Sequence, residues 1–574
     1  MNSLTSNQLD RRWIWAATVG LILFLLIQVF PVTGQLFTTE IQNVMTRSEA
    51  KNKALDLAAS KFGIKSEQVQ EATVTHLSDS NAVAYLSKYN FMKTADKLWT
   101  QATPTDVYAV KLLLKDSQDA LLISLNMENG KLVAWKFVGN NELNSVSSRS
   151  KANITDESVS SALQYAEFWG IPAAEWTWDE SRSDKSSMTF LSREGNIGET
   201  QLWLKVVVPE GFSALKSSNP PWIGGSIEYG VDLPKSFTSY LKNQESLASK
   251  LSMYGFILPQ IILFVLAIIY VGSYGGQTSY LRGIFLSAVY FVLYAGITFN
   301  MVPGLRASLW KSGNISVDVN TAIIITSIIM YGAMAVLTYF SAVAGDGLWK
   351  SMGHSLWPRW KEAGYGITVL KSMRVGYFLA FILLGAQSLI LLILEKTLGS
   401  FSSSDASQSM YNMTIPLLLP LLAWCAGISE ELQSRLLGIG LFRKWLVGGA
   451  RKILGREPSR RTAVTLTLIA MIPPGLLWAM GHVGYAIYPV YTRLIELVIM
   501  AILFGWFMLR FGIMTVIFAH VTLDAILMGM QMMFDGLPGD FFAGAFSLIM
   551  PGLAGIVIWW LHGVIKGKPK PTAV

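Results

Sequence analysis

Three short segments in the last third of the chain place ionisable side chains inside apolar sequence. They are residues 427–435 (GISEELQSR), 478–482 (WAMGH) and 520–524 (HVTLD). They contribute, in chain order, Glu430, Glu431, Arg435, His482, His520 and Asp524. A charged side chain at membrane depth costs at least about 2.5–3.5 kcal/mol on insertion scales, so such residues are functional candidates that face a bundle interior. Carboxylates and imidazoles together are the groups that activate water.

The spacing of the first segment separates the roles of its two carboxylates. In a helix, Glu431 and Arg435 are four residues apart and share a face, in the favourable order with the acid first. Glu430 points about 100° away and has no such partner. We therefore predict that Glu431 and Arg435 form a structural pair and that Glu430 is free to act as a base. The alternative is a salt bridge plus a solvated glutamate at a helix end.

The two histidines of these segments are candidates for binding a metal ion or water, because neutral imidazole does both. A lone membrane histidine more often makes a helix-packing hydrogen bond, but here two accompany a glutamate. Asp524 follows His520 by four residues, so both address one cavity, and Asp524 either orients the imidazole or touches substrate. The other three histidines are predicted to lie outside the site: His76, His354 and His562.

Composition shows what kind of molecule carries these segments. Hydrophobic residues make up 52% of the 574 residues and charged residues 15%, against about 25% charged in ordinary soluble domains. With a mean hydropathy of +0.40, this predicts a polytopic membrane protein. The net charge of +8 does not indicate nucleic-acid binding, because most Lys and Arg lie between apolar runs. The one cysteine, Cys425, cannot form an intrachain disulfide.

Ten apolar runs are long enough to cross a bilayer. They are residues 13–32, 254–272, 283–301, 321–343, 375–394, 415–437, 463–485, 494–511, 513–533 and 541–565. We read the first as a retained anchor rather than a signal peptide, since it is long and lacks a small-x-small cleavage site. The chain is predicted to be a mainly α-helical membrane protein of about ten transmembrane helices. Membrane lipids are expected to surround these helices.

The distribution of charge between the runs predicts the orientation. Residues 344–374 and 438–462 and the C-terminal tail are rich in Lys and Arg, whereas residues 395–414 and 534–540 are poor in them. Because basic loops favour the cytoplasm, both termini are predicted to be cytoplasmic, in a membrane that we expect to be a bacterial plasma membrane. The polar residues 33–250 are then extracytoplasmic.

Those polar residues read as an α+β domain of two related repeats. Residues 46–64 and 155–171 both open on Thr near acidic residues, a helix start, and both close on aromatic-Gly-Ile. Alternation predicts strands nearby. The predicted strands are residues 84–88, 107–114, 120–126, 189–193 and 200–208. The predicted division is 1–32 N-terminus and anchor, 33–250 the extracytoplasmic domain, 251–400 helices two to five, and 401–574 helices six to ten with the chemistry.

In order along successive runs stand Glu-Glu-x-x-x-Arg from Glu430, aromatic-x-x-x-His ending at His482, and His-x-x-x-Asp from His520. This ordered set resembles the CPBP family of intramembrane proteases, which includes the type II CAAX prenyl endopeptidases and bacteriocin-immunity-like bacterial members. The resemblance covers residues 410–535, about a fifth of the chain.

The resemblance implies a role for each position. Glu430 is the general base that activates water, and Arg435 braces Glu431. Trp478 stands where the family often has Phe, and it preserves an aromatic wall. Asp524 stands where many members have Asn.

An aspartate donates a hydrogen bond only when protonated, so metal binding or orientation of the histidine suits Asp524 better than oxyanion stabilisation. His482 and His520 hold a zinc ion or, in a metal-free mechanism, the water and the oxyanion. Two His and one Glu match the ligands of known zinc hydrolases, yet Glu430 cannot easily be both ligand and base. The alternative ligand is Glu431, which would strain its pairing with Arg435. The sequence therefore allows both a mechanism with Zn²⁺ and one without it.

The predicted depths of the site residues in the membrane do not agree. Counting from the span edges puts Glu430 and His520 towards the cytoplasmic half, but His482 near the outer end of its helix. A break at Pro473-Pro474 would shift that register, since non-helical backbone is tolerated at a buried cavity.

The expected function is an intramembrane endopeptidase acting on a peptide or membrane-protein substrate, with water activated by Glu430. The rival is a non-catalytic membrane receptor, immunity factor or scaffold that uses the extracytoplasmic domain. A transporter with a proton relay is a third possibility, but the membrane part shows no internal repeat. The enzyme requires the carboxylate of Glu430 and both imidazoles within several ångströms of one water-accessible point.

Overall fold

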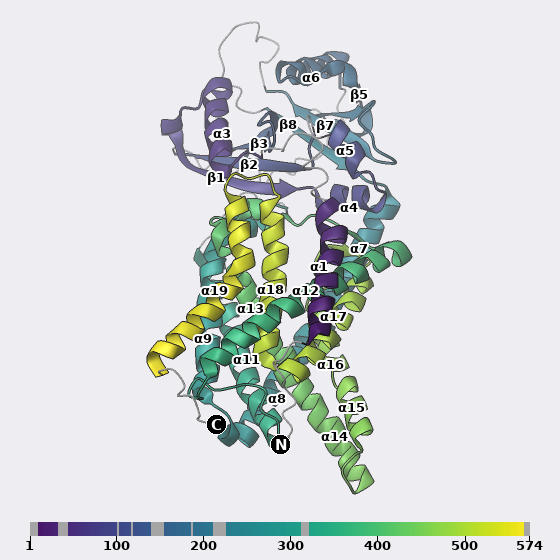
Figure 1. The fold of residues 1–574 in the computed structure, drawn as a ribbon. Helices are drawn as coiled ribbons and strands as arrows, with labels where there is room; N and C mark the ends of the chain where they lie inside the picture. Colours follow the sequence, from purple (N-terminus) through teal and green to yellow (C-terminus); the bar gives the residue numbers. More distant parts are fainter. Residues whose placement is uncertain are drawn as a thin grey trace.

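The computed structural model describes residues 10–31, 44–99, 103–115, 119–138, 154–184, 187–209, 225–311 and 321–566. A β-sheet domain lies on one end of a long helical bundle (Figure 1). The predicted class, a helical polytopic membrane protein with an inserted α+β domain, is confirmed. The polar residues 1–9 and the tail beyond Lys566, whose lysines supported the predicted orientation, lie outside the described residues.

The sheet has eight antiparallel strands in the order β1-β2-β3-β4-β8-β7-β6-β5. The strands are β1 (Val69–Ser78), β2 (Asp106–Leu114), β3 (Ala120–Asn126), β4 (Leu132–Val138), β5 (Trp176–Trp178), β6 (Met188–Ser192), β7 (Gln201–Val207) and β8 (Ser226–Asp232). Each half is a four-stranded meander, and the two meanders meet where β4 pairs with β8. This symmetry is what a duplicated unit produces.

A helix precedes each meander and covers the face of the sheet that points away from the bundle (Figure 1). These helices are α3 (Arg47–Phe62) and α6 (Asp156–Phe168). Thr46 caps α3 in a capping box with Glu49, and Thr155 caps α6, as the acidic Thr segments predicted. Gly63 ends α3 at φ 66°, a conformation that favours glycine.

Four of the five predicted strands are observed, as β2, β3, β6 and β7. The prediction for residues 84–88 is wrong, because they belong to helix α4 (Ser80–Lys88). Asp79 starts this helix by accepting a hydrogen bond from the backbone N–H of Ala82 at 3.0 Å. The apolar residues of α4 pack on α7 (Lys235–Lys250) through Phe237 and Leu241. A second short helix, α5 (Met92–Leu98), follows.

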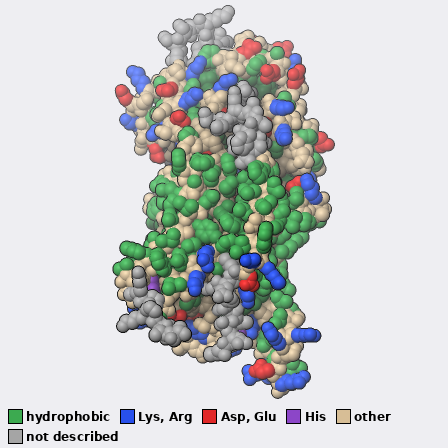
Figure 2. Space-filling model, in the orientation of Figure 1, with side chains coloured by type: hydrophobic (Ala, Val, Ile, Leu, Met, Phe, Trp, Pro, Cys, Tyr) green, Lys and Arg blue, Asp and Glu red, His purple; other side chains and the backbone are tan. Residues whose placement is uncertain are grey.

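Nine helices within the described residues are long and apolar enough to cross a membrane. They are Arg11–Val29 (α1 with η1), Lys235–Gln277 (α7, η7, α8 and η8), Tyr280–Asn300 (α9), Ile323–Ser351 (within α11, Thr321–Ser351), Tyr365–Leu398 (α12), Arg460–Met480 (α15 and α16), Val490–Phe511 (α17), Ile513–Met533 (α18) and Asp540–Lys566 (α19). Exposed hydrophobic side chains gather over the middle of the bundle, with charged side chains towards both ends (Figure 2). The chain is an integral membrane protein.

The remaining predicted span, residues 415–437, carries three charged side chains and begins with a short 3-10 turn, η11 (Pro416–Leu418). From Pro420 it is continuously helical, as α13 (Pro420–Glu430) and the π-helical segment η12 (Glu431–Ile439), and α14 (Gly440–Leu454) extends it. A short helix, α10 (Val302–Lys311), runs along the bundle end below the sheet.

The predicted span 463–485 is interrupted. α15 (Arg460–Ile469) ends before a turn, and α16 (Ile472–Met480) restarts with prolines in its first turn. After Met480 the chain leaves the helix and reaches strand β10 (Ile487–Tyr488), which pairs with β9 (Phe401–Ser402) near the sheet domain. The helix therefore does not continue to residue 485.

The bundle is closely packed where glycines meet. A Cβ on Gly385 of α12 would lie 2.4 Å from the Cα of Gly20 on α1. Small residues of this kind let membrane helices approach closely. The first helix is thus packed against the centre of the bundle.

The sheet domain is joined to the bundle through the loop before α13. The side chain of Asn412 accepts a hydrogen bond from the backbone N–H of His76 in β1 at 2.8 Å and donates one to its carbonyl at 2.9 Å. It also donates to the carbonyl of Ala406 at 2.7 Å. Asn412 thus pairs with the outer edge of β1 as a neighbouring strand would.

Candidate active site

Glu430 is the last residue of α13, at the junction with η12. This helix crosses α18 at Gly427, where a Cβ would lie 2.6 Å from the side chain of Val521. The close crossing brings Glu430 and Glu431 beside His520. A π-helical segment is rare and often occurs at functional sites, because its wider turn redirects the side chains on either side.

The carboxylate of Glu430 lies between the two predicted histidines. Its Oε1 is 3.5 Å from Nε2 of His482, and its Oε2 is 3.8 Å from Nε2 of His520. The indole N–H of Trp478 donates a hydrogen bond to Oε2. The side chains of Glu430 and His482 are 24% and 20% exposed, so this group of residues is partly accessible.

Glu431 lies on the closed side of the site and is fully buried. Its Oε1 is 3.3 Å from Nη1 of Arg435 and accepts a hydrogen bond from Nδ1 of His520 at 2.7 Å. Glu431 therefore holds both the arginine and the imidazole. The pairing with Arg435 follows the predicted spacing, whereas the contact with His520 comes from the crossing of two helices.

Two aromatic side chains enclose the guanidinium of Arg435. Its centre lies 4.2 Å from the ring centroid of Trp478 and 4.9 Å from that of Phe504. The ring of Phe504 also lies 5.0 Å from that of His520. The motifs in the sequence did not indicate Phe504 or the donor role of Trp478. The indole N–H was the available signal, since a buried tryptophan N–H finds an acceptor.

His482 reaches the site from the turn after α16 rather than from a helix. Its Nδ1 lies 2.8 Å from the carbonyl oxygen of Trp478. Its ring stacks on Tyr485, with the centroids 5.9 Å apart and the planes 7° from parallel. The interruption of the predicted span removes the register conflict, because a short helix and a turn bring His482 to Glu430.

Asp524 lies one turn beyond His520 on α18. Its Oδ2 is 3.5 Å from Nε2 of His520, and its side chain is 25% exposed. Nδ1 of the same ring is already occupied by Glu431. Of the two predicted roles for Asp524, orienting the imidazole therefore belongs mainly to Glu431, and the partly exposed Asp524 lies beside Nε2.

The hydrogen bonds at Nδ1 determine whether Nε2 of each ring accepts or donates a hydrogen bond. A carbonyl and an ionised carboxylate only accept hydrogen bonds, so Nδ1 of His482 and of His520 each carries a hydrogen. Each neutral ring then presents a lone pair at Nε2, and each cationic ring presents an N–H. Both Nε2 atoms lie near carboxylate oxygens, so the space between them suits a proton donor, a cation or a water molecule.

These donors are of the type that binds zinc. Across the described residues, no group of three or more His, Cys, Asp or Glu side chains is placed to hold a metal ion. We therefore assign no chemical step to a metal.

The remaining histidines lie elsewhere, as expected. His76 is in the sheet domain, where its Nε2 is 2.9 Å from Asp106. His562 contacts the carbonyl of Trp360 at 3.1 Å near the end of α19, and His354 follows α11.

A family model matches the part of the chain that contains the three motifs. Residues 412–526 match the family model described as type II CAAX prenyl endopeptidase Rce1-like. No curated protein and no solved structure matches the chain. The matched segment contains every residue of the site described above, and it begins at Asn412, which joins the bundle to the sheet domain. Residues 412–526 are thus similar to the family that the motifs resemble.

Proposed function

We propose that this protein is an intramembrane endopeptidase that hydrolyses a peptide bond with water activated by Glu430. One observation carries the proposal: the partly exposed carboxylate of Glu430 lies within 4 Å of Nε2 of both His482 and His520. A carboxylate beside two imidazoles, with a buried pair fixing one ring, meets the geometric requirement for a hydrolase. The Rce1-like match supports a CAAX-type protease.

In the proposed reaction, Glu430 accepts a proton from water while the oxygen attacks the peptide carbonyl carbon. The resulting oxyanion takes hydrogen bonds from Nε2–H of a cationic His482 or His520, whose Nδ1–H is held by its fixed acceptor. Glu430 then returns the proton to the leaving nitrogen as the C–N bond breaks. The products are a carboxylic acid and an amine.

Positioning falls to the surrounding residues. The indole N–H of Trp478 fixes one oxygen of Glu430, so the other faces His482. Glu431 fixes the ring of His520. Asp524 stabilises a cationic His520 by its charge at 3.5 Å. In the alternative mechanism, a zinc ion held by His482 and His520 would polarise the water and the peptide carbonyl, and metal analysis distinguishes the two.

We place the active site in the bilayer with the sheet domain, within residues 33–250, on the extracytoplasmic side of a bacterial plasma membrane and both termini in the cytoplasm. The basic segments at 344–374 and 438–462 support this orientation. Membrane lipids surround the bundle, and the substrate is a peptide or a membrane protein that reaches Glu430.

The test compares membranes from cells that express the wild-type protein or the Glu430→Gln variant. Hydrolysis by Glu430 predicts new protein N-termini, found by mass spectrometry, with the wild type only. The exposed Glu395→Gln serves as a matched control, because it makes the same change outside the site. Identical N-termini from wild type and Glu430→Gln, with equal amounts of inserted protein, would remove the enzyme assignment and favour the receptor or scaffold.

A further inference from the structure

The sheet opens between β4 and β8. These strands pair only at Trp135 with Ile227 and at Lys136 with Ser226. If the ladder continued, Ala134 would face Glu228, and the two strands would stay together to the end of β8. Instead, within the described residues, Glu228–Asp232 pair with β7 alone. The two strands therefore form a fork.

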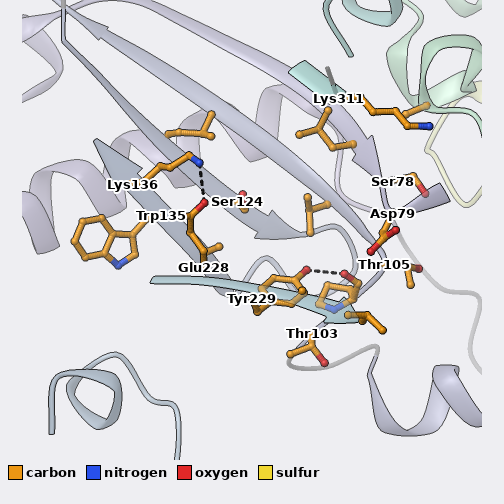
Figure 3. A pocket seen from close by; sticks show the side chains of 18 of the residues that line it. Ser78, Asp79, Thr103, Thr105, Ser124, Trp135, Lys136, Glu228, Tyr229 and Lys311 are labelled. Atoms are coloured by element: carbon orange, nitrogen blue, oxygen red, sulfur yellow. Dashed lines mark hydrogen bonds and ion pairs between the residues drawn. The ribbon is translucent and has the colours of Figure 1, made fainter. Parts of the chain in front are cut away.

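A cavity of about 310 Å³ occupies the open side of this fork. Ser124, Ala134 and Lys136 line it from β3 and β4, and Glu228 to Val231 line it from β8. Figure 3 shows Ser124, Lys136, Glu228 and Tyr229 on one side of the cavity, with Ser78, the last residue of β1, opposite them. Ala307 of α10 and Ala406 also reach it, so the cavity lies between the sheet and the bundle.

Charged groups of both signs stand at its two ends. Lys136 and Glu228 form an ion pair at 2.7 Å where the fork closes. At the other end lie Asp79 and Lys311 (Figure 3), and Lys311 donates to the hydroxyl of Ser80 at 3.0 Å. The wall between these ends is mostly small or apolar, with Leu122 among its residues.

Strand geometry makes the fork suited to main-chain recognition. In an antiparallel sheet, alternate residues turn their N–H and C=O groups to opposite sides. Along Glu228–Asp232, one set of these groups bonds to β7, and the other set faces the fork. An extended chain entering the fork would meet a row of backbone donors and acceptors, as in other cases where a peptide adds a strand to a sheet.

We propose that this fork binds an extended peptide segment, which lies against β8 as an added strand. The small residues Ser124 and Ala134 leave room for its backbone, and the charged groups at both ends match the mixed charges of a peptide. A membrane lipid is the less suitable occupant, because its acyl chains cannot satisfy the backbone groups of a strand. The binding does not depend on hydrolysis at Glu430.

The experiment uses the full-length Glu430→Gln protein in detergent micelles, so that peptide binding is measured without cleavage. The probe is a fluorescein-labelled mixture of decapeptides randomised at every position, and its partner mixture carries N-methyl groups at every second residue. Fluorescence anisotropy measures binding. We expect the N-methylated mixture to bind at least tenfold more weakly, because it lacks half of its backbone donors.

Two variants locate the binding. Ala134→Trp fills the fork and is expected to raise the dissociation constant at least tenfold. Thr177→Trp, on the exposed strand β5 at the far edge of the sheet, makes a similar change and is expected to have no effect. Equal binding of the two peptide mixtures, equal binding by the Ala134→Trp variant, or no binding of either mixture would overturn the proposal.

A second measurement needs only a small substitution, in case Ala134→Trp does not fold. The single native cysteine, Cys425, is buried, so Ser124→Cys introduces one accessible thiol in the fork. Bromoacetyl-labelled decapeptides should alkylate it at least tenfold faster than their N-methylated partners. Equal rates for both, with iodoacetamide reacting normally, would contradict strand addition and indicate adsorption by side chains or lipid-like contacts.

Discussion

Nδ1 of His520 donates to Oε1 of Glu431 at 2.7 Å, and the same carboxylate oxygen lies 3.3 Å from Nη1 of Arg435. Glu431 and Arg435 are almost completely inaccessible. A buried carboxylate between a guanidinium and an imidazole fixes the ring by charge as well as by a hydrogen bond. The more exposed Glu430 is then free for chemistry.

The Glu431→Gln variant should lose stability and activity together. It leaves the guanidinium of Arg435 buried without its partner, and breaking a buried pair costs about 3–5 kcal/mol. The amide also holds the ring of His520 less firmly. Thermal unfolding in micelles and the rate of substrate cleavage measure the two effects.

A double-mutant cycle with Arg435→Leu separates pairing from packing. Because replacing both charged partners avoids an unpaired charge, we expect the double variant to be more stable than Glu431→Gln alone. A double variant whose losses simply add would show that Glu431 and Arg435 are not energetically coupled.

The Trp478→Phe variant should lower kcat roughly ten- to a hundredfold. Phenylalanine keeps the aromatic face over Arg435 but cannot donate the hydrogen bond to Glu430, and hydrogen bonds to charged groups contribute about 1.5–3 kcal/mol. Steady-state cleavage kinetics measure the change. Trp560→Phe, at an exposed position of α19, is the control, and equal kcat values for both variants would contradict the role of the indole N–H.

Local spacing predicted some of these relations and missed others. The i,i+4 rule places Glu431 with Arg435, and the same rule places Asp524 beside His520. The contact between Glu431 and His520 depends on how two helices cross at Gly427, which no single segment encodes. The donor role of Trp478 depends likewise on the turn that ends α16.

The same limit appears in the fold. The Thr caps and the closing glycines correctly predicted where α3 and α6 begin and end, because these residues determine helix ends through contacts within a few residues. Residues 84–88 alternate like a strand, but they lie in helix α4, which Asp79 caps. Phe237, about 150 residues further along the chain, packs on this helix. The proline pair before residue 475 indicated the interruption that brings His482 to Glu430.

The Asn412→Ala variant should loosen the connection between the sheet domain and the loop that precedes α13. It removes hydrogen bonds to both backbone groups of His76 and to Ala406, and leaving buried groups unsatisfied costs about 1–3 kcal/mol. Hydrogen exchange at His76 should become faster, while exchange within α6, on the opposite face of the sheet, stays the same. Unchanged exchange at His76 would show that β1 is held by other contacts.

Metal analysis distinguishes the two versions of the mechanism. If the side chains alone activate water, purified wild-type protein should contain much less than one zinc ion per chain, and chelator should leave cleavage unchanged. Stoichiometric zinc that is lost in a His482→Ala, His520→Ala double variant would contradict this expectation and assign the two Nε2 atoms as ligands.

Stability should fall as the pH rises from about 4 to about 7, and Asp535 should account for part of the fall. This residue lies in the turn between α18 and α19, where burial, with Asp540 nearby, raises its pKa to about 7. The unfolded carboxyl has a pKa of about 3.9, so between these values the folded state retains a proton that the unfolded state releases. The stabilisation is complete below the lower value and is lost through the upper one.

The Asp535→Asn variant should flatten this dependence, because an amide does not titrate and can still accept the hydrogen bond from the backbone N–H of Leu537. Thermal midpoints measured in micelles from pH 4 to pH 8 provide the comparison. Asp56→Asn, an exposed change on α3, should follow the wild-type curve. If the curves of wild type and Asp535→Asn run parallel, Asp535 does not carry this proton.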